Sequence, residues 1–438
     1  LESILDGFKP SKEYDINLLN EEFEKMKKKI VSGLLAMATV MSMSGFMIPA
    51  QAADGDALEV WVRNSYYDEM VEASKAFTEK TGIQVNVTEP SNMSDDLALA
   101  LSSGDTPDVV SIDCVLAPYY ASIGALKDIT EEFNGLEYKD SFSGGLLDLS
   151  NYEGEQYAVP FAPDLSVLIY NKDIFEANGL DPESPPKTWD ELIEAAKACT
   201  SDDCYGYVFS AADAGGMMFT FGPYIWNNGG EFTSEDGSES LLDSAEAIGA
   251  LQLITDMVYE YKVTPESITS YDWTATADAF KAQKAAMIVL GSSAVGDIVN
   301  DNYDFKAGCA LIPSSDGTKY ASFSGGDSIA ILADTDMPDE AWQFVEFCLS
   351  EEVQVGQLAA SGNIPARSDL FDNEIYAGHR EYDVLRQALE VGKAPYSLKY
   401  NEMYTPWLDA VQYALNQEKT PEEAMKDAKA EIDDILAE

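Results

Sequence analysis

The sequence predicts an α/β protein in which largely parallel strands alternate with helices from Leu58 onward. Two observations support this prediction. Short apolar runs of strand length recur between segments whose apolar residues repeat at helical spacing. Glycine, proline or a helix-capping residue stands at many of the boundaries between them. With 438 residues, 46% of them apolar, the chain is long enough for two or three hydrophobic cores.

The first strand–helix unit is the clearest example of the pattern. Residues 58–62 form an apolar run of strand length, and Met70, Ala73 and Phe77 then fall on one face of a helix. Gly82 ends that helix, because glycine adopts the left-handed conformation that follows a helix C-terminus. The unit repeats, with strands expected at 83–87 and 108–112, a helix through 97–101, and a break at 104–107.

Two capping boxes mark later helices. Thr188 is followed three residues on by Glu191, and Thr420 by Glu423, so each pair can satisfy two free backbone N–H groups at a helix start. Between these helices, two apolar runs bordered by glycine are expected to be buried strands, at 285–290 and 328–332.

The chain is strongly acidic, with 27 basic and 78 acidic residues and a formal net charge of -51. Such a field repels nucleic acid and anionic membrane surfaces and favours solubility. The sequence therefore excludes binding to a phosphate backbone, and we interpret most of the carboxylates as a solvated surface.

A secretory signal is predicted near the start of the chain. Residues 26–29 are a methionine and three lysines, 30–48 are mainly apolar, and Ala50 and Ala52 supply the small residues of a cleavage site. This order predicts cleavage between Ala52 and Ala53, whereas a membrane-spanning helix is the alternative reading of the same apolar run. Residues 1–25 precede a complete signal and are expected to be an upstream extension.

The cysteines and the single histidine predict neither a zinc cluster nor a disulfide framework. No cysteine follows the cleavage site, so no lipid anchor is expected there. Cys199 and Cys204 are close in sequence, which leaves a short disulfide loop and free thiols equally open. His379 stands in a polar stretch and is expected at the surface.

Seven segments occur in an order that is typical of one protein family. They are 76–83 (AFTEKTGI), 103–110 (SGDTPDVV), 157–161 (YAVPF), 168–173 (LIYNKD), 186–192 (PKTWDEL), 279–287 (AFKAQKAAM) and 364–367 (IPAR). On these segments the chain resembles the family 1 extracellular solute-binding proteins of ABC transporters, which include maltose and multiple-sugar binding proteins. The resemblance covers nearly all of residues 57–438.

The resemblance implies a two-lobed periplasmic-binding-protein-like fold of type II, with hinge crossings near residues 162, 326 and 370. One lobe is expected to contain 53–162 and 327–370, and the other 163–326 and 371–438. It further implies a monomer without a cofactor, exported to the periplasm or the cell exterior. Such a protein captures a sugar by lobe closure and delivers it to the permease of an ABC importer.

Polar ligand contacts are expected where strands end, because loops at the carboxyl ends of strands face the ligand in open α/β sheets. Arg63 and Asn64 follow the first strand, and Asp113 follows the third. Asp164 stands where the resemblance places an acidic sugar ligand. Carboxylates suit sugars because each can accept hydrogen bonds from two hydroxyl groups.

Aromatic contacts are expected to stack on the apolar face of a sugar ring. Trp226 and Trp273 stand beside polar residues, and the resemblance places Tyr404 and Trp407 in a late aromatic platform. Relatives carry tryptophan where this chain has Ser292, which thins the platform and casts doubt on a long maltodextrin. The remaining expected contacts are Gly325, Gly326 and Asp327, before the strand 328–332, and Arg367.

Three alternatives remain at this point. A secreted glycoside hydrolase could use Asp113 and Asp164, but no catalytic signature surrounds them. A polyamine could bind through several carboxylates and aromatic faces. An iron site is disfavoured, because tyrosine and histidine ligands are not grouped in the sequence.

Overall fold

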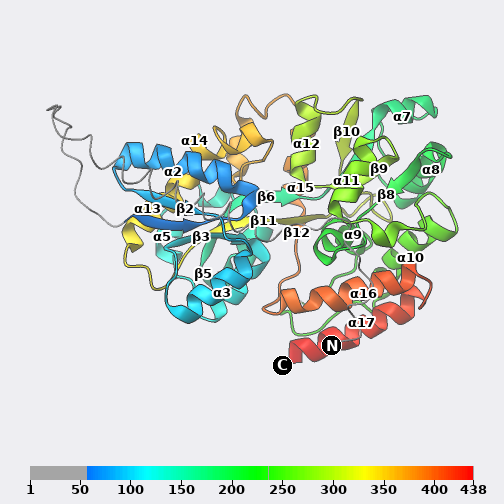
Figure 1. The fold of residues 1–438 in the computed structure, drawn as a ribbon. Coiled ribbons are helices and arrows are strands. Elements are labelled where there is room, and N and C mark those ends of the chain that lie inside the picture. The colour runs from blue at the N-terminus through cyan, green and yellow to red at the C-terminus, as the bar shows by residue number, and fades with distance from the viewer. Residues whose placement is uncertain (1–56, 235, 438) are drawn as a thin grey trace, which may run out of the picture. The chain divides into compact units, whose positions relative to one another are not determined.

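Two mixed sheets organise the part of the chain that the computed structural model describes, residues 57–437 except 235 (Figure 1). The larger has six strands and the smaller has four. The strands are not largely parallel as expected, since half of the pairings in these two sheets are antiparallel. The reason is that the longest strand, β11 (Ser322–Ile331), runs against both of its long neighbours.

The six-stranded sheet has the order β12-β11-β3-β1-β2, with β6 also paired to β11. Its side chains alternate between two cores, as the two-residue period of a strand requires. Ile329 and Ile331 face the core under α2 and α13, whereas Ala330 faces the core under α3 and α4. The other strands are β1 (Leu58–Trp61), β2 (Val85–Thr88), β3 (Val109–Asp113), β6 (Ala158–Leu165) and β12 (Gly392–Lys393); the helices are α2 (Tyr67–Thr81), α3 (Met93–Ser103), α4 (Ala117–Ser122) and α13 (Pro338–Cys348).

The four-stranded sheet has the order β10-β7-β9-β8 and lies in the centre of the larger hydrophobic core. Helices α8 and α11 pack on it, and α10, α16 and α17 pack together beside α9 (Figure 1). The strands are β7 (Val167–Asn171), β8 (Tyr205–Val208), β9 (Ala285–Leu290) and β10 (Ala307–Ala310); the helices are α7 (Lys172–Ala177), α8 (Trp189–Cys199), α9 (Ala214–Asn227), α10 (Ala245–Tyr259), α11 (Trp273–Lys281), α12 (Ser292–Val299), α15 (Arg380–Glu390), α16 (Tyr404–Leu415) and α17 (Pro421–Ala437).

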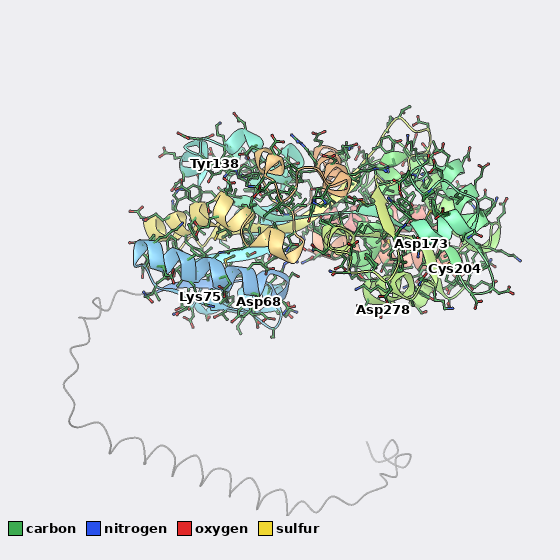
Figure 2. All side chains as sticks on the ribbon, turned by 90° about the horizontal axis from the view of Figure 1, so that it is seen from above. Asp68, Lys75, Tyr138, Asp173, Cys204 and Asp278 are labelled. Atoms are coloured by element: carbon green, nitrogen blue, oxygen red, sulfur yellow. The ribbon has the colours of Figure 1, made fainter. Side chains whose placement is uncertain are left out.

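Short elements connect these layers. Seen from above, Tyr138 and Lys75 lie with the first sheet, and Asp173 and Asp278 with the second (Figure 2). The short elements are η1 (Asn64–Tyr66), η2 (Cys114–Leu116), α5 (Thr130–Asn134), η3 (Lys139–Ser141), α6 (Gly144–Leu149), β4 (Asn151–Tyr152), β5 (Glu155–Gln156), η4 (Ile268–Ser270), α14 (Glu351–Gln354), η5 (Leu358–Ser361), η6 (Ser368–Asp372) and η7 (Tyr400–Met403).

Strands β6 and β11 form an antiparallel ribbon that leads from the first sheet toward the second. At its end the backbone N–H of Ser166 donates to the carbonyl of Phe323 at 3.1 Å, and the N–H of Phe323 donates to Ser166 Oγ at 2.8 Å. Gly326 sits within the ribbon with φ +96°, where an added Cβ would lie 2.6 Å from the backbone nitrogen of Asp164. Only glycine fits this close approach.

Most expected elements are found, with shifted ends. Both capping boxes form, since the N–H of Glu191 donates to Thr188 Oγ1 and that of Glu423 to Thr420 Oγ1, each at 3.2 Å. The expected strand at 328–332 is wrong in its start, because β11 begins at Ser322. The first half of β11, residues 322–326, consists mostly of serine and glycine and has no apolar pattern. This half is a strand because its backbone pairs with β6.

Some expectations lie outside the described residues. The signal at 26–52 and the cleavage between Ala52 and Ala53 fall there, and the lobe boundaries stay a prediction. Among the residues that the structure describes, no helix is both long and apolar enough to cross a membrane.

The question left open for the two neighbouring cysteines is answered by the structure. Cys199 and Cys204 are both buried free thiols. Burial raises the pKa of the Cys199 thiol to about 12. The thiol form of this cysteine therefore predominates at neutral pH.

Replacing Gly326 by alanine is expected to destabilise the protein more than replacing Gly82. Gly82 also has a positive φ, +82°, but an added Cβ there meets nothing within 4 Å. Gly82→Ala should cost about 1–2 kcal/mol of left-handed strain, whereas Gly326→Ala adds a collision with the β6 backbone and should cost about 3 kcal/mol or more. Urea unfolding of both variants measures the difference; equal losses would contradict the close approach.

Candidate functional site

Three charged side chains meet at the edge of the first sheet. Arg63 follows β1 and Asp113 ends β3, and because these neighbouring strands are parallel their carboxyl ends lie together. Asp327 pairs with Asp113 across β11 and β3. Arg63 Nε donates to Asp327 Oδ1 at 2.8 Å, Arg63 Nη1 donates to Asp113 Oδ2 at 3.0 Å, and Nη2 also bonds Asp327. Ser111 Oγ donates to the other oxygen of Asp327 at 2.7 Å.

The two carboxylates differ in exposure, and this decides what each can do. The side chains of Arg63 and Asp113 are 30% and 31% exposed, whereas that of Asp327 is 0% exposed. Arg63 and Asp113 can therefore reach a ligand, but Asp327 cannot. Asp327 instead fixes the position of the guanidinium through a two-point hydrogen bond.

The charges in this group act on one another. Burial alone would lower the pKa of Arg63, but Asp327 and Asp113 raise it well above its usual value. Burial raises the pKa of Asp113, although Arg63 opposes the shift. Arg63 is therefore a cation at neutral pH, while burial makes the ionised form of Asp113 costly.

Asp164 reaches the same region from β6. The backbone N–H of Ser292, the first residue of α12, donates to Asp164 Oδ1 at 2.7 Å. Ser292 Oγ in turn accepts the N–H of Leu165 at 3.0 Å. An added Cβ on Gly291 would lie 2.5 Å from Asp164 Oδ1, so the preceding glycine makes room for this carboxylate. Burial raises the pKa of Asp164, while the bonds from Ser292 oppose the shift.

Tyr66 lies close to these carboxylates. Its hydroxyl donates to the carbonyl of Ala162 at 3.3 Å. Burial raises its pKa most, followed by the charges of Asp327, Asp164 and Asp113 in that order. We call Arg63, Asp113, Asp164 and Asp327 the acidic cluster.

A row of contacting aromatic rings lies next to the acidic cluster. Trp273, at the start of α11, meets Phe219 of α9 edge-on with centroids 5.3 Å apart, and Phe219 lies 5.4 Å from Phe323. Phe323 adjoins the cluster, since an added Cβ on Gly325 would touch both its ring and the carbonyl of Asp164. Trp273 and Phe219 are half-buried, so each can offer part of a ring.

Tyr404 also lies beside the acidic cluster. Burial raises its pKa most, and the charge of Asp113 raises it further. Its ring meets Tyr400 at a centroid distance of 5.0 Å, nearly perpendicular. Tyr404 is half-buried at the start of α16, and its contact with a ligand stays a prediction.

Several expected contacts have other partners in the structure. Trp226 and Trp407 are 5% and 1% exposed and pack on Phe232, so neither presents a free ring face. Arg367 uses its guanidinium within the fold, donating to Asp369 and to the Leu349 carbonyl. These three are better explained as structural, and the sequence missed this because burial around α9 depends on packing among distant segments.

For Asn64, Gly325 and Gly326 the structure shows local contacts that neither support nor exclude ligand binding. Asn64 is exposed at the start of η1 and donates to Glu89 Oε1 at 2.6 Å. Gly325 and Gly326 lie inside β11, where they allow the approach of Phe323 and of β6. Two neighbours of expected contacts that the sequence did not single out are Phe323 and Tyr400, which stand four residues before Asp327 and Tyr404 and are largely buried.

Comparison with known proteins identifies the family and the fold. Residues 61–355 match the family described as bacterial extracellular solute-binding protein. An ABC transporter solute-binding protein from Thermotoga lettingae, bound with α-D-tagatose, is 28% identical with a TM-score of 0.78, covering 87% of this chain and 100% of that one. The maltose-bound protein MalE3 from T. maritima is 25% identical with a TM-score of 0.76, covering 86% and 100%.

Sequence similarity to a known binding protein also extends over most of the chain. The diacetylchitobiose binding protein DasA from Streptomyces coelicolor is 24% identical over 366 residues, covering 80% of this chain and 84% of that protein. The comparisons confirm the family expected from the seven segments and the two-lobed fold.

Replacing Arg63 by methionine should destabilise the unliganded protein by about 3 kcal/mol or more, because Asp327 is left buried without its cation. The control is Lys75→Met, which breaks a fully hydrated pair with Glu72 and should cost about 0–1 kcal/mol. Urea unfolding of both variants tests this. Equal losses of unfolding free energy in the two variants would show that the Arg63 ion pairs stabilise the fold no more than a surface pair does.

Replacing Asp164 by asparagine should raise the unfolding free energy near pH 7. The folded-state pKa of Asp164 is raised, so its ionisation disfavours the folded state as pH rises through that pKa. Asparagine keeps an acceptor for the Ser292 N–H without the charge. The advantage of the variant should shrink as pH falls to the range where Asp164 is protonated in both states. A variant less stable than wild type at pH 7 would contradict this.

Proposed function

The chain belongs to the family of bacterial extracellular solute-binding proteins, and from this premise we propose that it captures a sugar or polyol for an ABC importer. The observation that carries the proposal is the acidic cluster, whose Arg63 and Asp113 are partly exposed and whose Asp164 adjoins Phe323. From Phe323 a row of contacting rings continues through Phe219 to Trp273. Carboxylates and a guanidinium offer acceptors and donors to ring hydroxyls, and aromatic faces cover the apolar side of the sugar.

Named relatives support this ligand class. The structures that resemble this chain include proteins bound with tagatose, maltose and ribitol. All three ligands present several hydroxyl groups on a small carbon skeleton, which is the pattern that the acidic cluster can bind.

The ligand that we propose is small. Ser292 occupies the position where relatives carry tryptophan, and its N–H and Oγ are both used in holding Asp164 and Leu165. No large ring covers the ligand from that residue, so we favour a monosaccharide, a disaccharide or a polyol over a long oligosaccharide.

Binding works by holding two lobes together. Arg63 and Asp113 belong to the first expected lobe, whereas Ser292, Trp273 and Tyr404 belong to the second. A ligand that touches both sides stabilises the closed form in proportion to those extra contacts. The permease of the importer then receives the closed, loaded protein. We propose that the protein acts outside the cytoplasm as a monomer, without a cofactor and without cleaving its ligand.

A polyamine is the second candidate. The acidic cluster contains three carboxylates and one guanidinium, so its net charge is about -2 when all ionise. A diammonium ligand would neutralise that excess, and the neighbouring rings could contact its cations.

The purified protein should bind one sugar or polyol in a one-to-one complex. We would screen tagatose, glucose, maltose, ribitol, diacetylchitobiose, putrescine and spermidine by thermal shift and measure the hits by calorimetry. Trp273→Ala should weaken the sugar about tenfold or more by removing an aromatic face. Tyr205→Ala, which removes an exposed ring from the start of β8, should leave affinity unchanged.

Other outcomes would change the conclusion. Binding of spermidine or putrescine alone would replace the sugar by a polyamine. Recovery of cleaved maltose or diacetylchitobiose after incubation would overturn the proposal that the protein is not an enzyme.

A further inference from the structure

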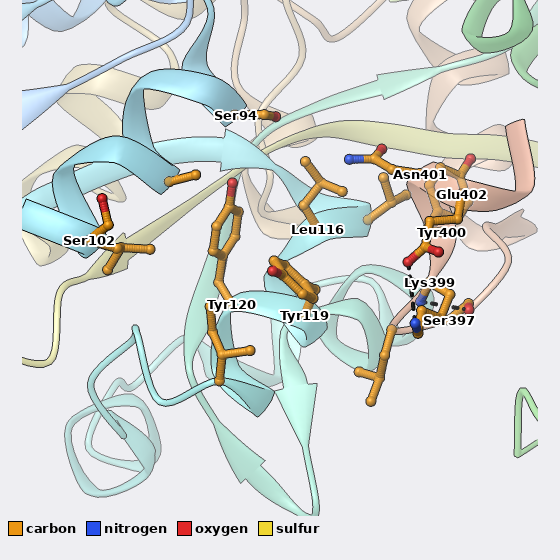
Figure 3. A pocket seen from close by; sticks show the side chains of 15 residues that line it. Ser94, Ser102, Leu116, Tyr119, Tyr120, Ser397, Lys399, Tyr400, Asn401 and Glu402 are labelled. Atoms are coloured by element: carbon orange, nitrogen blue, oxygen red, sulfur yellow. Dashed lines mark hydrogen bonds and ion pairs between the residues drawn. The ribbon is translucent and has the colours of Figure 1, made fainter. Parts of the chain in front are cut away.

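A pocket of about 560 Å³ lies between α3, the η2–α4 turn and the segment 397–402 (Figure 3). Leu116, Tyr119 and Tyr120 stand on one side of it, and Ser397, Lys399 and Tyr400 on the other (Figure 3). The two sides belong to the two expected lobes. A group bound here therefore touches both of them.

The walls of this pocket are mainly apolar. Tyr119 and Ile123 are 43% and 52% exposed, which is unusual for large apolar side chains that lie together. Part of the polar lining is already engaged, since Lys399 lies 3.4 Å from Glu402 and its N–H donates to Ser397 Oγ. The apolar lining residues are Ala98, Leu101, Val115, Leu116, Tyr119, Tyr120, Ile123, Leu398 and Tyr400.

Two pocket-lining residues connect the pocket to the acidic cluster and to the neighbouring Tyr404. Val115 lines the pocket, and its N–H donates to Asp113 Oδ1 at 3.4 Å, so the η2 turn borders both. Tyr400 lines the pocket and packs edge-on against Tyr404. Burial raises the pKa of Tyr400 most, and the charges of Tyr404 and Asp113 raise it further.

Tyr400 forms part of the pocket wall but is only 3% exposed. Its hydroxyl is buried, so the residue offers the pocket the edge of its ring and not a free polar group.

We propose that this pocket binds an aromatic or similarly apolar substituent carried by the sugar that the acidic cluster holds. The inference rests on the proposed sugar-binding function and names a ligand class for it, an aryl glycoside. An apolar ring suits the pocket better than a second sugar ring, because most of the wall, including Leu116 and Ile123, offers sugar hydroxyls no hydrogen-bond partner. The volume lies in the range of small-molecule sites.

The test compares methyl and phenyl glycosides of glucose, galactose, mannose and N-acetylglucosamine by calorimetry. For the sugar that binds, the phenyl glycoside should bind about tenfold tighter than the methyl glycoside, because it buries a ring in the pocket. Ala98→Trp fills the pocket from the exposed face of α3 and should remove this advantage while leaving the methyl glycoside unchanged.

The matched control is Leu99→Trp. Leu99 is the next residue of α3, 67% exposed, and is not among the pocket-lining residues. The phenyl advantage should persist in that variant and should fall several-fold in Ile123→Asn, which makes one exposed wall polar.

Each result separates the inference from the proposed function. Equal affinity for the two glycosides, or binding of a free sugar but of neither glycoside, overturns the inference and leaves sugar capture standing. Loss of the phenyl advantage in Leu99→Trp also overturns the assignment of this pocket. A protein that binds no sugar, polyol or glycoside overturns both.

Discussion

The buried carboxylate of Asp327 is the constraint on which the site depends. It stands in the middle of the longest strand with no exposed side-chain surface, so its charge must be met by groups from elsewhere in the chain. Arg63 and Ser111 meet it, from β1 and β3, and the strands are thereby held in one register. The same contact leaves Arg63 extended across the sheet edge, with Nη1 directed to Asp113. One buried charge thus links strand pairing to the placement of the exposed groups.

Glycine at position 326 makes this geometry possible. The ribbon of β6 and β11 carries Asp164 and Asp327 on adjoining strands, and the register shifts between Asp327 and Ser328. A side chain at Gly326 would push β6 away and move Asp164 from α12. The ribbon also leads toward the second sheet, so the strands that carry Asp164 and Asp327 also connect the two sheets. In the proposed closure, ligand contact and hinge position are therefore coupled in the backbone.

The sequence predicted the repeating units well because local signals determine them. Gly82 ends α2, and the Thr188 and Thr420 boxes start α8 and α17, all by contacts within a few residues. It also placed Arg63, Asp113 and Asp164 at strand ends or crossings, where the structure has them. The expectations failed where distant packing decides. The burial of Trp226 and Trp407 depends on rings from α9, the loop at Phe232 and α16, and no local pattern shows it. The first half of β11 lacks an apolar period because its partner strand, not its side chains, defines it.

Burial leaves electrostatic costs in the acidic cluster that the proposed ligand would relieve. Burial makes the ionised forms of Asp113 and Asp164 costly, and the Tyr400 hydroxyl is buried without a partner in the described residues. Asp113 and Asp164 belong to the acidic cluster, and Tyr400 lines the apolar pocket. A ligand with hydroxyl donors beside the carboxylates relieves costs that the fold itself leaves unmet. Asp113 lies in the first expected lobe and Asp164 in the second. In the proposed mechanism, a ligand that bonds both carboxylates therefore gains this relief in full only when the two lobes close around it.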